Sequence, residues 1–351
     1  MNVHLHRMAR SAAKPSKTAL PRAARQKRIT EVKTLLRSGE GARALPIIGD
    51  RWVLLILRDA FLGARRFEDF RRLTGAARGT LTSRLAALVQ QGVLYRNEYR
   101  KTPVRHEYRL SEKGMALYPV ALALWHWESH WAGAFGLPPR LVHKGCGMVM
   151  EPELACGYCG QVVLPTDVTY ESGAGAKVYT AQRAQPRRRR QSPDHAAEGV
   201  DTTMFHSVDT LGDRWTVLLL ACLYFGLHRY DDISAALGIA TNILADRLRR
   251  LLSAGIVQQH LYHDGPPRYE YRLSTKGWGL YPATLAIHEW ATAWIASPSG
   301  PALKLRHRPC GHGLRTKMRC NCCLGLVDPH AVGVKPSSRW KAQRGSLPTR
   351  S

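Results

Sequence analysis

Apolar and polar positions recur along the chain with a spacing that predicts helices. The segment Leu45–Gly63 has apolar residues at helical spacing and ends at a glycine, which suits a helix C-terminus. A short helical pattern then ends at Gly75, and in the next one Leu81, Leu85 and Leu88 recur at i, i+4 and i+7. These patterns predict a core helix followed by two short helices that a tight turn joins.

The pattern after these helices changes to that of strands. Between Val93 and Leu110, two β-prone runs flank a polar turn containing Pro103, which predicts a hairpin. Two short helices with a tight turn, the second with polar residues on its outer N-terminal half, are typical of a helix-turn-helix. A hairpin directly after them makes a winged helix. Exposed hairpins are often charged, so the order of the elements, and not the charge, carries this prediction.

The whole pattern occurs twice. The stretch GDRWVLLIL that begins at Gly49 returns as GDRWTVLLL from Gly212, and the offset between the copies stays constant as far as Trp131 and Trp294. A repeat of this length indicates a duplicated domain rather than a solenoid, whose repeats are about 20 to 50 residues long.

Composition narrows the function classes. The chain has 351 residues, of which 44% are hydrophobic, and 52 Lys and Arg against 26 Asp and Glu give a formal net charge of +26. Such a charge favours a polyanionic partner, with nucleic acid ahead of an anionic membrane surface. The longest apolar run, Trp215–Leu227, is shorter than the roughly 20 residues that a membrane-spanning helix needs. We therefore expect no membrane-spanning segment and no membrane partner.

The segments from about Leu45 to Trp131 and from about Ser207 to Trp294 resemble the HxlR-type winged helix-turn-helix regulators, a MarR-like group. That family's pattern has an Ile-Gly-x-Lys-Trp start, a Gly-x-x-Arg-Phe centre and a Glu-Tyr-x-Leu-Thr exit from the wing, and several of these anchors fall in order in both copies. The resemblance implies a sequence-specific transcriptional regulator that binds double-stranded operator DNA, as family members do in the form of homodimers. It also implies a cytoplasmic bacterial protein that is nucleoid-associated when bound to DNA.

The chain departs from the family pattern at the start motif. Arg51 and Arg214 replace the usual lysine and keep its charge. Several family members sense oxidants through a cysteine just before this motif, whereas neither copy has a cysteine there. Thiol sensing at that place is therefore excluded.

We expect DNA contacts from the second short helix and the hairpin of each copy, because positive wing side chains can reach phosphates beside the groove that the helix enters. The candidates are Arg78, Thr80, Ser83, Arg84, Arg96, Arg100, Lys101 and Arg105 in the first copy, and Thr241, Asn242, Asp246, Arg249 and Arg268 in the second. Gln259, His263 and Asp264 replace basic wing residues in the second copy. The sequence thus predicts an imperfect inverted repeat that is bound more strongly through the first copy, unless Arg249, Arg250 and the four arginines from Arg187 compensate.

Seven of the eight cysteines follow the winged helices, and six of them form, with two histidines, two His-x2-Cys and Cys-x2-Cys sets with identical spacing. The sets are His143, Cys146, Cys156 and Cys159, and His307, Cys310, Cys320 and Cys323. We call each pair of residues separated by two others a hook. Two such hooks together are typical of a tetrahedral zinc site, so we expect two structural zinc ions, one in each set. Three alternatives remain: the cysteines form disulfides, another residue replaces the histidine as ligand, or Cys322 competes with its neighbours for the metal. The eighth cysteine, Cys222, is expected to be a buried thiol.

Two other function classes remain open. His126-Trp127-Glu128 together with Cys156 and Cys159 has elements of the zinc deaminase signature, but no proline precedes Cys156 and the second copy lacks the His-x-Glu. We therefore expect no enzyme. A scaffold that uses its zinc ribbons for protein contacts is the stronger alternative, and steep salt dependence of binding would distinguish DNA binding from it.

The expected fold is mainly α with small β-hairpins, in which two winged helices in tandem are each followed by a zinc-ribbon-like module. The expected segments are a disordered basic arm (1–43), winged helices (44–135 and 205–298), zinc-ribbon-like modules (136–172 and 299–334), a basic linker (173–204) and a basic tail (335–351). Leu117, Val120, Leu124, Trp127 and Trp131, matched in the second copy by Leu280, Ala283, Ile287, Trp290 and Trp294, have the spacing of a two-helix seam. This stripe predicts an intrachain pseudo-dimer of the two copies, with further self-association open.

Overall fold

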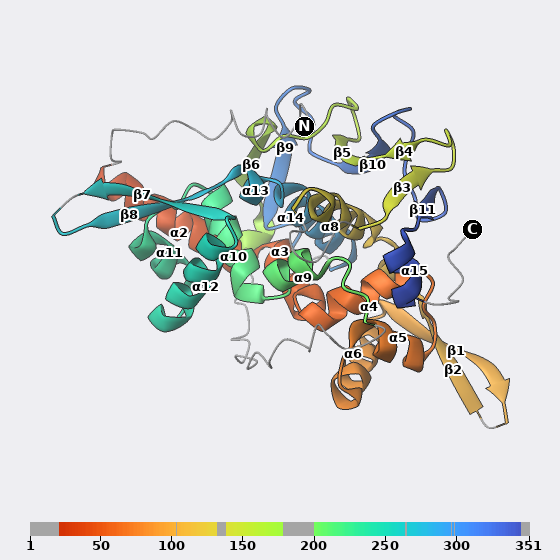
Figure 1. Ribbon diagram of the computed structural model, residues 1–351. Helices are drawn as coiled ribbons and strands as arrows, with labels where there is room; N and C mark the ends of the chain where they lie inside the picture. Colours follow the sequence, from red (N-terminus) through yellow and green to blue (C-terminus); the bar gives the residue numbers. More distant parts are fainter. Residues whose placement is uncertain are drawn as a thin grey trace. The chain divides into compact units, whose positions relative to one another are not determined.

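A computed structural model describes residues 21–344, apart from residues 103, 132–137, 178–199, 264, 296 and 298 (Figure 1). The described residues form two compact units. Unit 1 contains residues 21–44, 156–177 and 213–315, and unit 2 contains residues 45–155, 200–212 and 316–344. Each unit therefore combines segments from both halves of the sequence. No helix of the described part is long and apolar enough to cross a bilayer.

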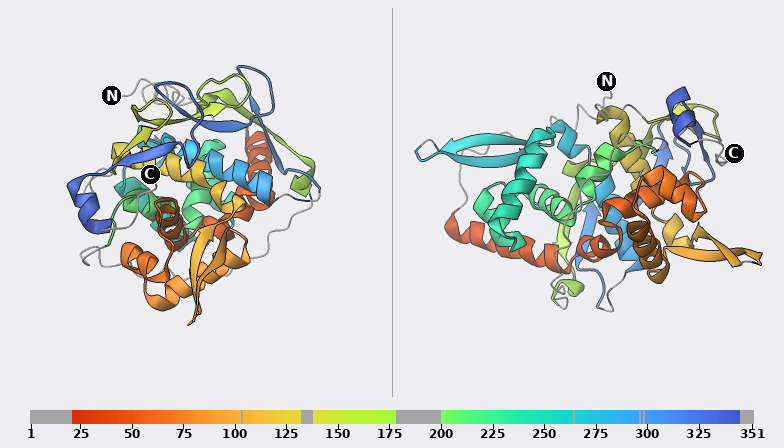
Figure 2. Two further views of the ribbon diagram at one scale, coloured as in Figure 1. Left: turned by 90° about the vertical axis from the view of Figure 1, so that its right-hand side faces the viewer. Right: turned by 60° about the horizontal axis from the view of Figure 1, so that its bottom comes forward.

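Unit 2 contains the first winged helix, in the order that the sequence predicts. Its elements are α4 (Arg51–Phe61), α5 (Phe67–Thr74), α6 (Arg78–Gln90), β1 (Leu94–Lys101) and β2 (Val104–Leu110). Gly75 ends α5 in the left-handed conformation (φ 67°), and Leu81, Leu85 and Leu88 of α6 are buried as expected. The antiparallel hairpin β1–β2 extends away from α5 and α6 (Figures 1 and 2).

The single helix expected over Leu45–Gly63 is divided in two. A helix α3 (Glu40–Ile48) ends before Gly49, and α4 begins after Asp50, whose side chain accepts hydrogen bonds from the backbone N–H groups of Trp52 and Val53. An aspartate that caps the first turn starts a new helix even within a continuous apolar pattern.

Unit 1 repeats the winged helix with the second copy. Its elements are α10 (Arg214–Tyr224), α11 (Tyr230–Leu237), α12 (Thr241–Ser253), β7 (Val257–His263) and β8 (Arg268–Leu273). The register of the hairpin shifts between Leu261 and His263, and the first hairpin shifts at the equivalent place, between Glu98 and Arg100. The duplication therefore preserves local irregularities as well as the helices.

The helix α2 (Arg22–Ser38) precedes the first winged helix in sequence but packs in unit 1, against the second. The Arg25 side chain bonds Asp232 of α11, and Arg28 donates to the carbonyl of Phe225. Ile29, Val32, Leu35 and Leu36 form its buried face. The expected disordered arm is therefore wrong from Arg22 onward, because apolar residues at helical spacing within this basic segment find a partner surface; residues 1–20 lie outside the described residues.

Unit 1 is completed by segments that follow both winged helices. They include β6 (Val168–Ser172), the single-turn helices η2 (Pro165–Asp167) and η3 (Ala174–Lys177), α13 (Thr275–Trp278), α14 (Tyr281–Trp294) and β9 (Leu303–His307). Antiparallel pairing of β6 with β9 joins a strand that follows the first copy to one that follows the second. The arginine run of the linker lies outside the described residues.

Unit 2 has the reciprocal arrangement. Helix α9 (Phe205–Leu211) precedes the second winged helix in sequence but packs on α4 and on α8 (Tyr118–Trp131) of the first. The buried Glu128 carboxylate accepts from the backbone N–H groups of His206 and Ser207, at 3.2 and 2.7 Å, in the first turn of α9. An acceptor at a helix N-terminus satisfies otherwise unpaired donors, so Glu128 fixes α9 on α8.

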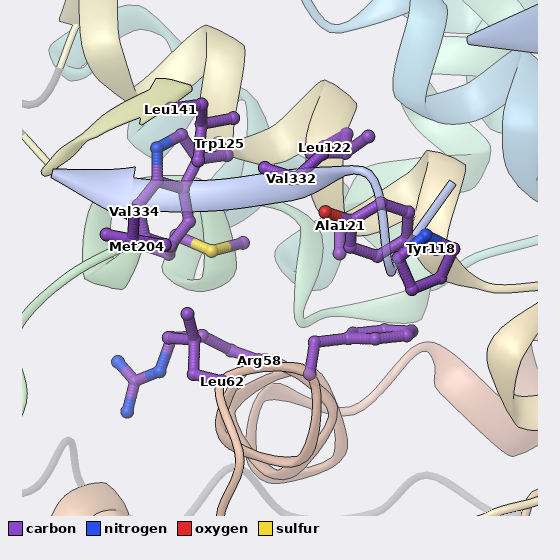
Figure 3. Close-up of a pocket in the computed structure, with 12 residues that line it drawn as sticks. Arg58, Leu62, Tyr118, Ala121, Leu122, Trp125, Leu141, Met204, Val332 and Val334 are labelled. Atoms are coloured by element: carbon purple, nitrogen blue, oxygen red, sulfur yellow. The ribbon is translucent and has the colours of Figure 1, made fainter. Parts of the chain in front are cut away.

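Further strands and two short helices complete unit 2. They are α7 (Glu112–Met115), β3 (Arg140–His143), β4 (Val149–Met150), β5 (Pro152–Cys156), β10 (Thr316–Cys320), β11 (Val332–Lys335) and α15 (Ser338–Arg344). β11 pairs with β3, and β10 pairs with β5. Figure 3 shows an apolar pocket between α4, α8 and β11, with Leu62, Trp125 and Val332 among its lining residues. The last strand of the chain therefore closes the core around the first winged helix.

The C-terminal segment is anchored by a buried charge network. Arg344 donates to Asp59 and Asp201 at 2.8 and 2.7 Å, while Arg58 bonds Asp59 and the carbonyls of Asp201 and Thr203. Burial alone would raise the pKa of Asp201, but Arg58 and Arg344 outweigh it and lower this pKa. The network therefore stabilises unit 2 above the ordinary pKa of aspartate, and this contribution is lost as the pH falls through the lowered value. The basic tail expected over residues 335–351 is therefore held on unit 2 as far as Arg344.

We expect Arg344→Ala to lower the free energy of unfolding by about 3–5 kcal/mol, because it leaves two buried carboxylates with one arginine. Denaturant unfolding followed by tryptophan fluorescence measures the change. Arg71→Ala, which removes an exposed ion pair with Glu68, is the control and should change stability by less than about 1 kcal/mol. Equal effects of the two variants would contradict a stabilising role for the network.

Candidate nucleic-acid interface and metal centres

The start motif of each copy positions the second helix of its helix-turn-helix. Asp50, the residue that caps α4, also accepts two hydrogen bonds from Arg84 of α6, each 2.9 Å long. Asp213 caps α10 and pairs with Arg247 of α12 in the same way. The side chain of Arg84 is only 19% exposed, and its guanidinium is occupied by the Asp50 carboxylate. Arg84 therefore fixes the orientation of α6, whether or not it also contacts DNA.

The central motif positions the wing. The guanidinium of Arg66 lies 5.2 Å from the ring centroid of Tyr99 in β1, and that of Arg229 lies 4.4 Å from Tyr262 in β7. Cations over aromatic faces at these distances attract the ring, and more strongly where water is partly excluded. The two motifs therefore set the helix and the hairpin relative to each other in each copy.

The other candidate residues of the first copy lie on the surface. Arg78 is 77% exposed at the start of α6, where it is 3.8 Å from Glu68, and Ser83 is exposed one and a half turns later, with Thr80 half-buried between them. Arg96, Arg100, Lys101 and Arg105 are exposed on the hairpin. Arg100 and Arg105 are direct neighbours across it, and Lys101 pairs with Val104. The hairpin tip thus holds three positive charges together.

The second copy has a less positive surface. Thr241, Asn242, Arg249 and Arg268 are exposed, but Asp246 lies on the outer side of α12. Burial would raise the pKa of Asp246, but its bonds to Arg250 and Arg247 outweigh this and lower it, so the side chain is charged. Arg249 also lies 3.7 Å from this carboxylate. Asp246 therefore neutralises part of the arginine charge of α12, and Asp264 lies outside the described residues.

The eight expected metal ligands gather in two clusters, but not in the expected sets. One cluster combines His143 and Cys146 with Cys320 and Cys323 in unit 2; the other combines Cys156 and Cys159 with His307 and Cys310 in unit 1. The expectation of one site in each contiguous segment is therefore wrong. Its cause is strand exchange: β5 pairs with β10 and β6 with β9, so each His-x2-Cys hook meets the Cys-x2-Cys hook of the other segment.

The distances within the clusters fit a tetrahedral ion. Zinc bonds of about 2.3 Å to sulfur and 2.0–2.1 Å to nitrogen place neighbouring ligand atoms roughly 3.6–3.8 Å apart. His143 Nδ1 lies 3.5 Å from Cys146 Sγ and 3.2 Å from Cys323 Sγ. Cys146 Sγ lies 4.0 Å from Cys320 Sγ, far beyond a disulfide bond. All eight cysteines are free thiols, which contradicts the disulfide alternative.

The second cluster has the same geometry. His307 Nδ1 lies 3.4 Å from Cys159 Sγ and 3.3 Å from Cys310 Sγ, and Cys156 Sγ lies 3.9 Å from Cys310 Sγ. Burial would raise the pKa of Cys156, but backbone N–H groups of Cys159 and Tyr158 lower it below its ordinary value. Backbone donors aimed at a cysteine favour the thiolate, which is the form that binds metal.

Each hook ends in a left-handed residue. Gly147, Gly160 and Gly311 follow the second ligand of three hooks with φ of 70°, 72° and 73°, and Leu324 occupies the same place in the fourth with φ of 58°. In all four, the N–H of this residue bonds the carbonyl of the first ligand. Glycine is the usual residue in this conformation, so the sequence gives no sign that Leu324 must adopt it as well.

The remaining cysteines and the deaminase-like residues lie elsewhere. Cys222 is buried in α10, as expected, and burial raises its pKa; Cys322 is exposed and outside the cluster. Cys156 and Cys159 gather with His307 and Cys310, whereas His126 lies near His130 and Glu151. Because Glu128 is committed to α9, it has no free carboxylate for proton transfer. The structure thus brings together no deaminase constellation among the described residues.

Sequence reasoning missed the double role of the aspartate in the start motif. Asp50 and Asp213 stand directly before a helical apolar run, which is a recognisable capping signal. Their pairing with Arg84 and Arg247 depends on the packing of two helices, so no local signal reveals it. The exchange between the metal-binding hooks was hidden for the same reason, since both pairings have identical spacing.

Comparison with known proteins follows the two winged helices. The HxlR-like helix-turn-helix family matches residues 47–135 and 210–299, about half of the chain. The uncharacterized HTH-type transcriptional regulator Rv3095 of Mycobacterium tuberculosis is 43% identical over 140 residues, covering 40% of this chain and 89% of the relative. The regulator YvaP of Bacillus subtilis, also uncharacterized, is 38% identical over 90 residues, 25% of this chain and 83% of the relative.

A solved structure of similar sequence, the transcription-factor candidate PA1607, is 30% identical over 37% of this chain and 91% of its own, with a TM-score of 0.34. This score is too low to inform the arrangement of the fold. The sequence matches alone therefore carry the family assignment.

We expect Leu324→Gly to stabilise unit 2 by about 0.5–1 kcal/mol. A left-handed residue with a Cβ costs roughly 1–2 kcal/mol, which exceeds the backbone entropy of about 0.5–1 kcal/mol that glycine loses on folding. Leu324 is 60% exposed, so little burial is lost. Denaturant unfolding measures the change, and Gly311→Ala, at the matched place in unit 1, should be destabilising. A loss of stability in Leu324→Gly would show that its side chain matters more than its backbone.

Proposed function

The chain belongs to the HxlR-like helix-turn-helix family, and we propose that it is a sequence-specific transcriptional regulator that binds operator DNA through both of its winged helices. The observation that carries this proposal is the juxtaposition, in unit 2, of an exposed polar face on α6 with a hairpin whose tip holds Arg100, Lys101 and Arg105. Such a helix suits the major groove, and such a hairpin suits the flanking phosphates.

We propose further that the two copies act as a pseudo-dimer within one chain and read an inverted-repeat-like operator. The exchange of segments supports this: α2, which precedes the first copy, packs with the second, and α9, which precedes the second, packs with the first. Trp127, one residue of the expected seam, stacks on His206 inside unit 2 with ring centroids 4.9 Å apart. Part of the apolar stripe therefore stabilises a unit from within.

The two clusters are proposed to hold one structural zinc ion each. Three thiols and one imidazole suit zinc, and four protein ligands leave no position for a substrate water. The ion would hold two hooks together in each unit, so its binding energy contributes directly to folding. No step of DNA recognition needs the metal itself.

Unequal binding by the two copies is part of the proposal. The first hairpin carries three basic residues at its tip, whereas His263 faces Arg268 at the matched place of the second. Asp246 holds Arg250 and Arg247 and lies near Arg249, which reduces the charge that α12 offers to phosphates. Fewer phosphate contacts release fewer counterions, so the second copy should contribute less of the salt-dependent affinity.

Zinc analysis of paired variants tests the ligand exchange. Cys146→Ser plus Cys320→Ser alters one cluster and should leave about one ion per chain. Cys146→Ser plus Cys156→Ser alters both clusters and should leave almost none. Elemental analysis of the purified full chain gives the counts. If instead the first double variant lost both ions and the second kept one, each ion would be bound within one contiguous segment. A wild-type chain without zinc would contradict the metal proposal.

Binding to the natural operator at several salt concentrations tests the DNA proposal. We expect Arg100→Ala plus Lys101→Ala to weaken binding and to reduce the salt slope by about two, roughly one per lost phosphate contact. Arg249→Ala plus Arg268→Ala should reduce both by less, because Arg249 is partly neutralised by Asp246.

Arg22→Ala plus Lys27→Ala is the matched control, since it removes two exposed charges from α2 outside the winged helices. An equal effect of this control would mean that only the net charge matters. Equal effects of the two winged-helix pairs would contradict the asymmetry, and binding insensitive to salt would favour protein docking over DNA recognition.

A further inference from the structure

A third group of metal-ligand side chains lies in unit 2, apart from the two cysteine clusters. It consists of His126 and His130 on α8 and Glu151 in the turn between β4 and β5, and their ligand atoms lie within 4.8 Å of one another. The group contains no cysteine, and neither the family motifs nor the DNA-binding surface accounts for it.

The helix presents both imidazoles on one face. His126 and His130 are separated by one helical turn, and their ring centroids lie 4.7 Å apart. His130 Nε2 is 3.8 Å from Glu151 Oε1, so the carboxylate lies at the side of the histidine pair. Two histidines at i and i+4 with a nearby carboxylate are an arrangement that binds divalent transition metals.

The hydrogen bonds of His130 prepare it as a ligand. Its Nδ1 lies 2.9 Å from the carbonyl oxygen of His126 and 3.1 Å from Ser129 Oγ. Because Ser129 Oγ itself donates to that carbonyl and the carbonyl can only accept, Nδ1 carries the hydrogen. The lone pair is then on Nε2, which faces Glu151. A second-shell bond of this kind fixes the tautomer and orientation of metal-binding histidines.

His126 contributes an unsatisfied nitrogen. Its Nδ1 is buried and has no hydrogen-bond partner among the described residues. A buried polar atom without a partner keeps the cost of its lost hydration, so ligation of an ion through this nitrogen would offset a cost already present in the fold. The unpaired nitrogen is an observation independent of the proximity of the three side chains.

We propose that His126, His130 and Glu151 form a third metal site, which binds a first-row divalent ion such as Zn²⁺ through two imidazoles and one carboxylate. Three protein ligands leave coordination positions for water, so this ion exchanges more readily than one held by four. Glu128 binds the N-terminus of α9, so no free carboxylate on this helix serves as a general base, and the site binds without catalysing.

Among the described residues, the second copy has no equivalent of this site. At the matched positions of the second copy, Glu289, Ala293 and Arg315 replace the two histidines and the glutamate. Its position is also tied to a cysteine cluster, because Glu151 N–H donates to the Asn321 side chain at 2.9 Å and Asn321 N–H donates back to the Glu151 carbonyl. Asn321 directly follows the cluster residue Cys320, so an intact cluster holds Glu151 in place.

Zinc titration of the full chain tests the site without reference to DNA. Protein purified with both cysteine clusters loaded is titrated with Zn²⁺ by calorimetry, and zinc is counted after removal of free metal. We expect one further equivalent in the wild type and none in His130→Ala or Glu151→Arg, the latter copying the residue of the second copy. His330→Ala removes an exposed imidazole of the same unit and should keep the further equivalent.

Two measurements keep the result decisive. Co²⁺ added to the zinc-loaded chain should give weak d–d bands without the intense sulfur-to-cobalt absorption of a thiolate site. Glu151→Gln, which preserves shape, replaces Glu151→Arg if that variant loses its cluster zinc, and it should also lack the further ion. No further equivalent in the wild type, its retention in the His130 and Glu151 variants, or a thiolate spectrum would each overturn the proposal.

Discussion

The meeting of Cys and His residues from distant segments in each of the two clusters is the constraint on which the rest of the structure depends. Cys146 and Cys320 are 174 residues apart in sequence, and Cys156 and Cys310 are 154 apart, yet each pair lies within about 4 Å. Bringing such distant hooks together costs loop-closure entropy, which grows only slowly with loop length. The pairing of β5 with β10 and of β6 with β9 offsets part of this cost. The geometry of the clusters and the pairing of these strands therefore depend on each other.

A second constraint acts inside each winged helix. One aspartate both starts the core helix and holds an arginine of the helix that faces outward, so the orientation of the outer helix is tied to the start of the inner one. The stacked arginine of the central motif does the same for the hairpin. These short motifs specify the relative placement of three elements, which explains why a duplicated sequence keeps them while its surface charges diverge.

The elements of the winged helices could be predicted from sequence because they depend on local spacing: Leu81, Leu85 and Leu88 define a buried face, and Gly75 ends a helix. The Cys and His residues that gather in the two clusters could be picked out for the same reason. Their grouping could not, since identical spacing in two segments is compatible with either pairing. The helix Arg22–Ser38 could not be predicted either. Its four buried apolar residues stand among many charged ones, and the surface on which they pack lies about two hundred residues further along the sequence.

The anchoring of α15 has a consequence for the order in which the protein is made. The first winged helix leaves the ribosome early, but Cys320, β11 and Arg344 of the same unit are among the last described residues to be synthesised. Asp59 and Asp201 therefore have only Arg58 as a basic partner until Arg344 is made, and His143 and Cys146 wait for the other two residues of their cluster. A chain that stops before Cys320 contains the residues of both winged helices but completes only one cluster, and it lacks the strand β11 and the helix α15 that unit 2 needs.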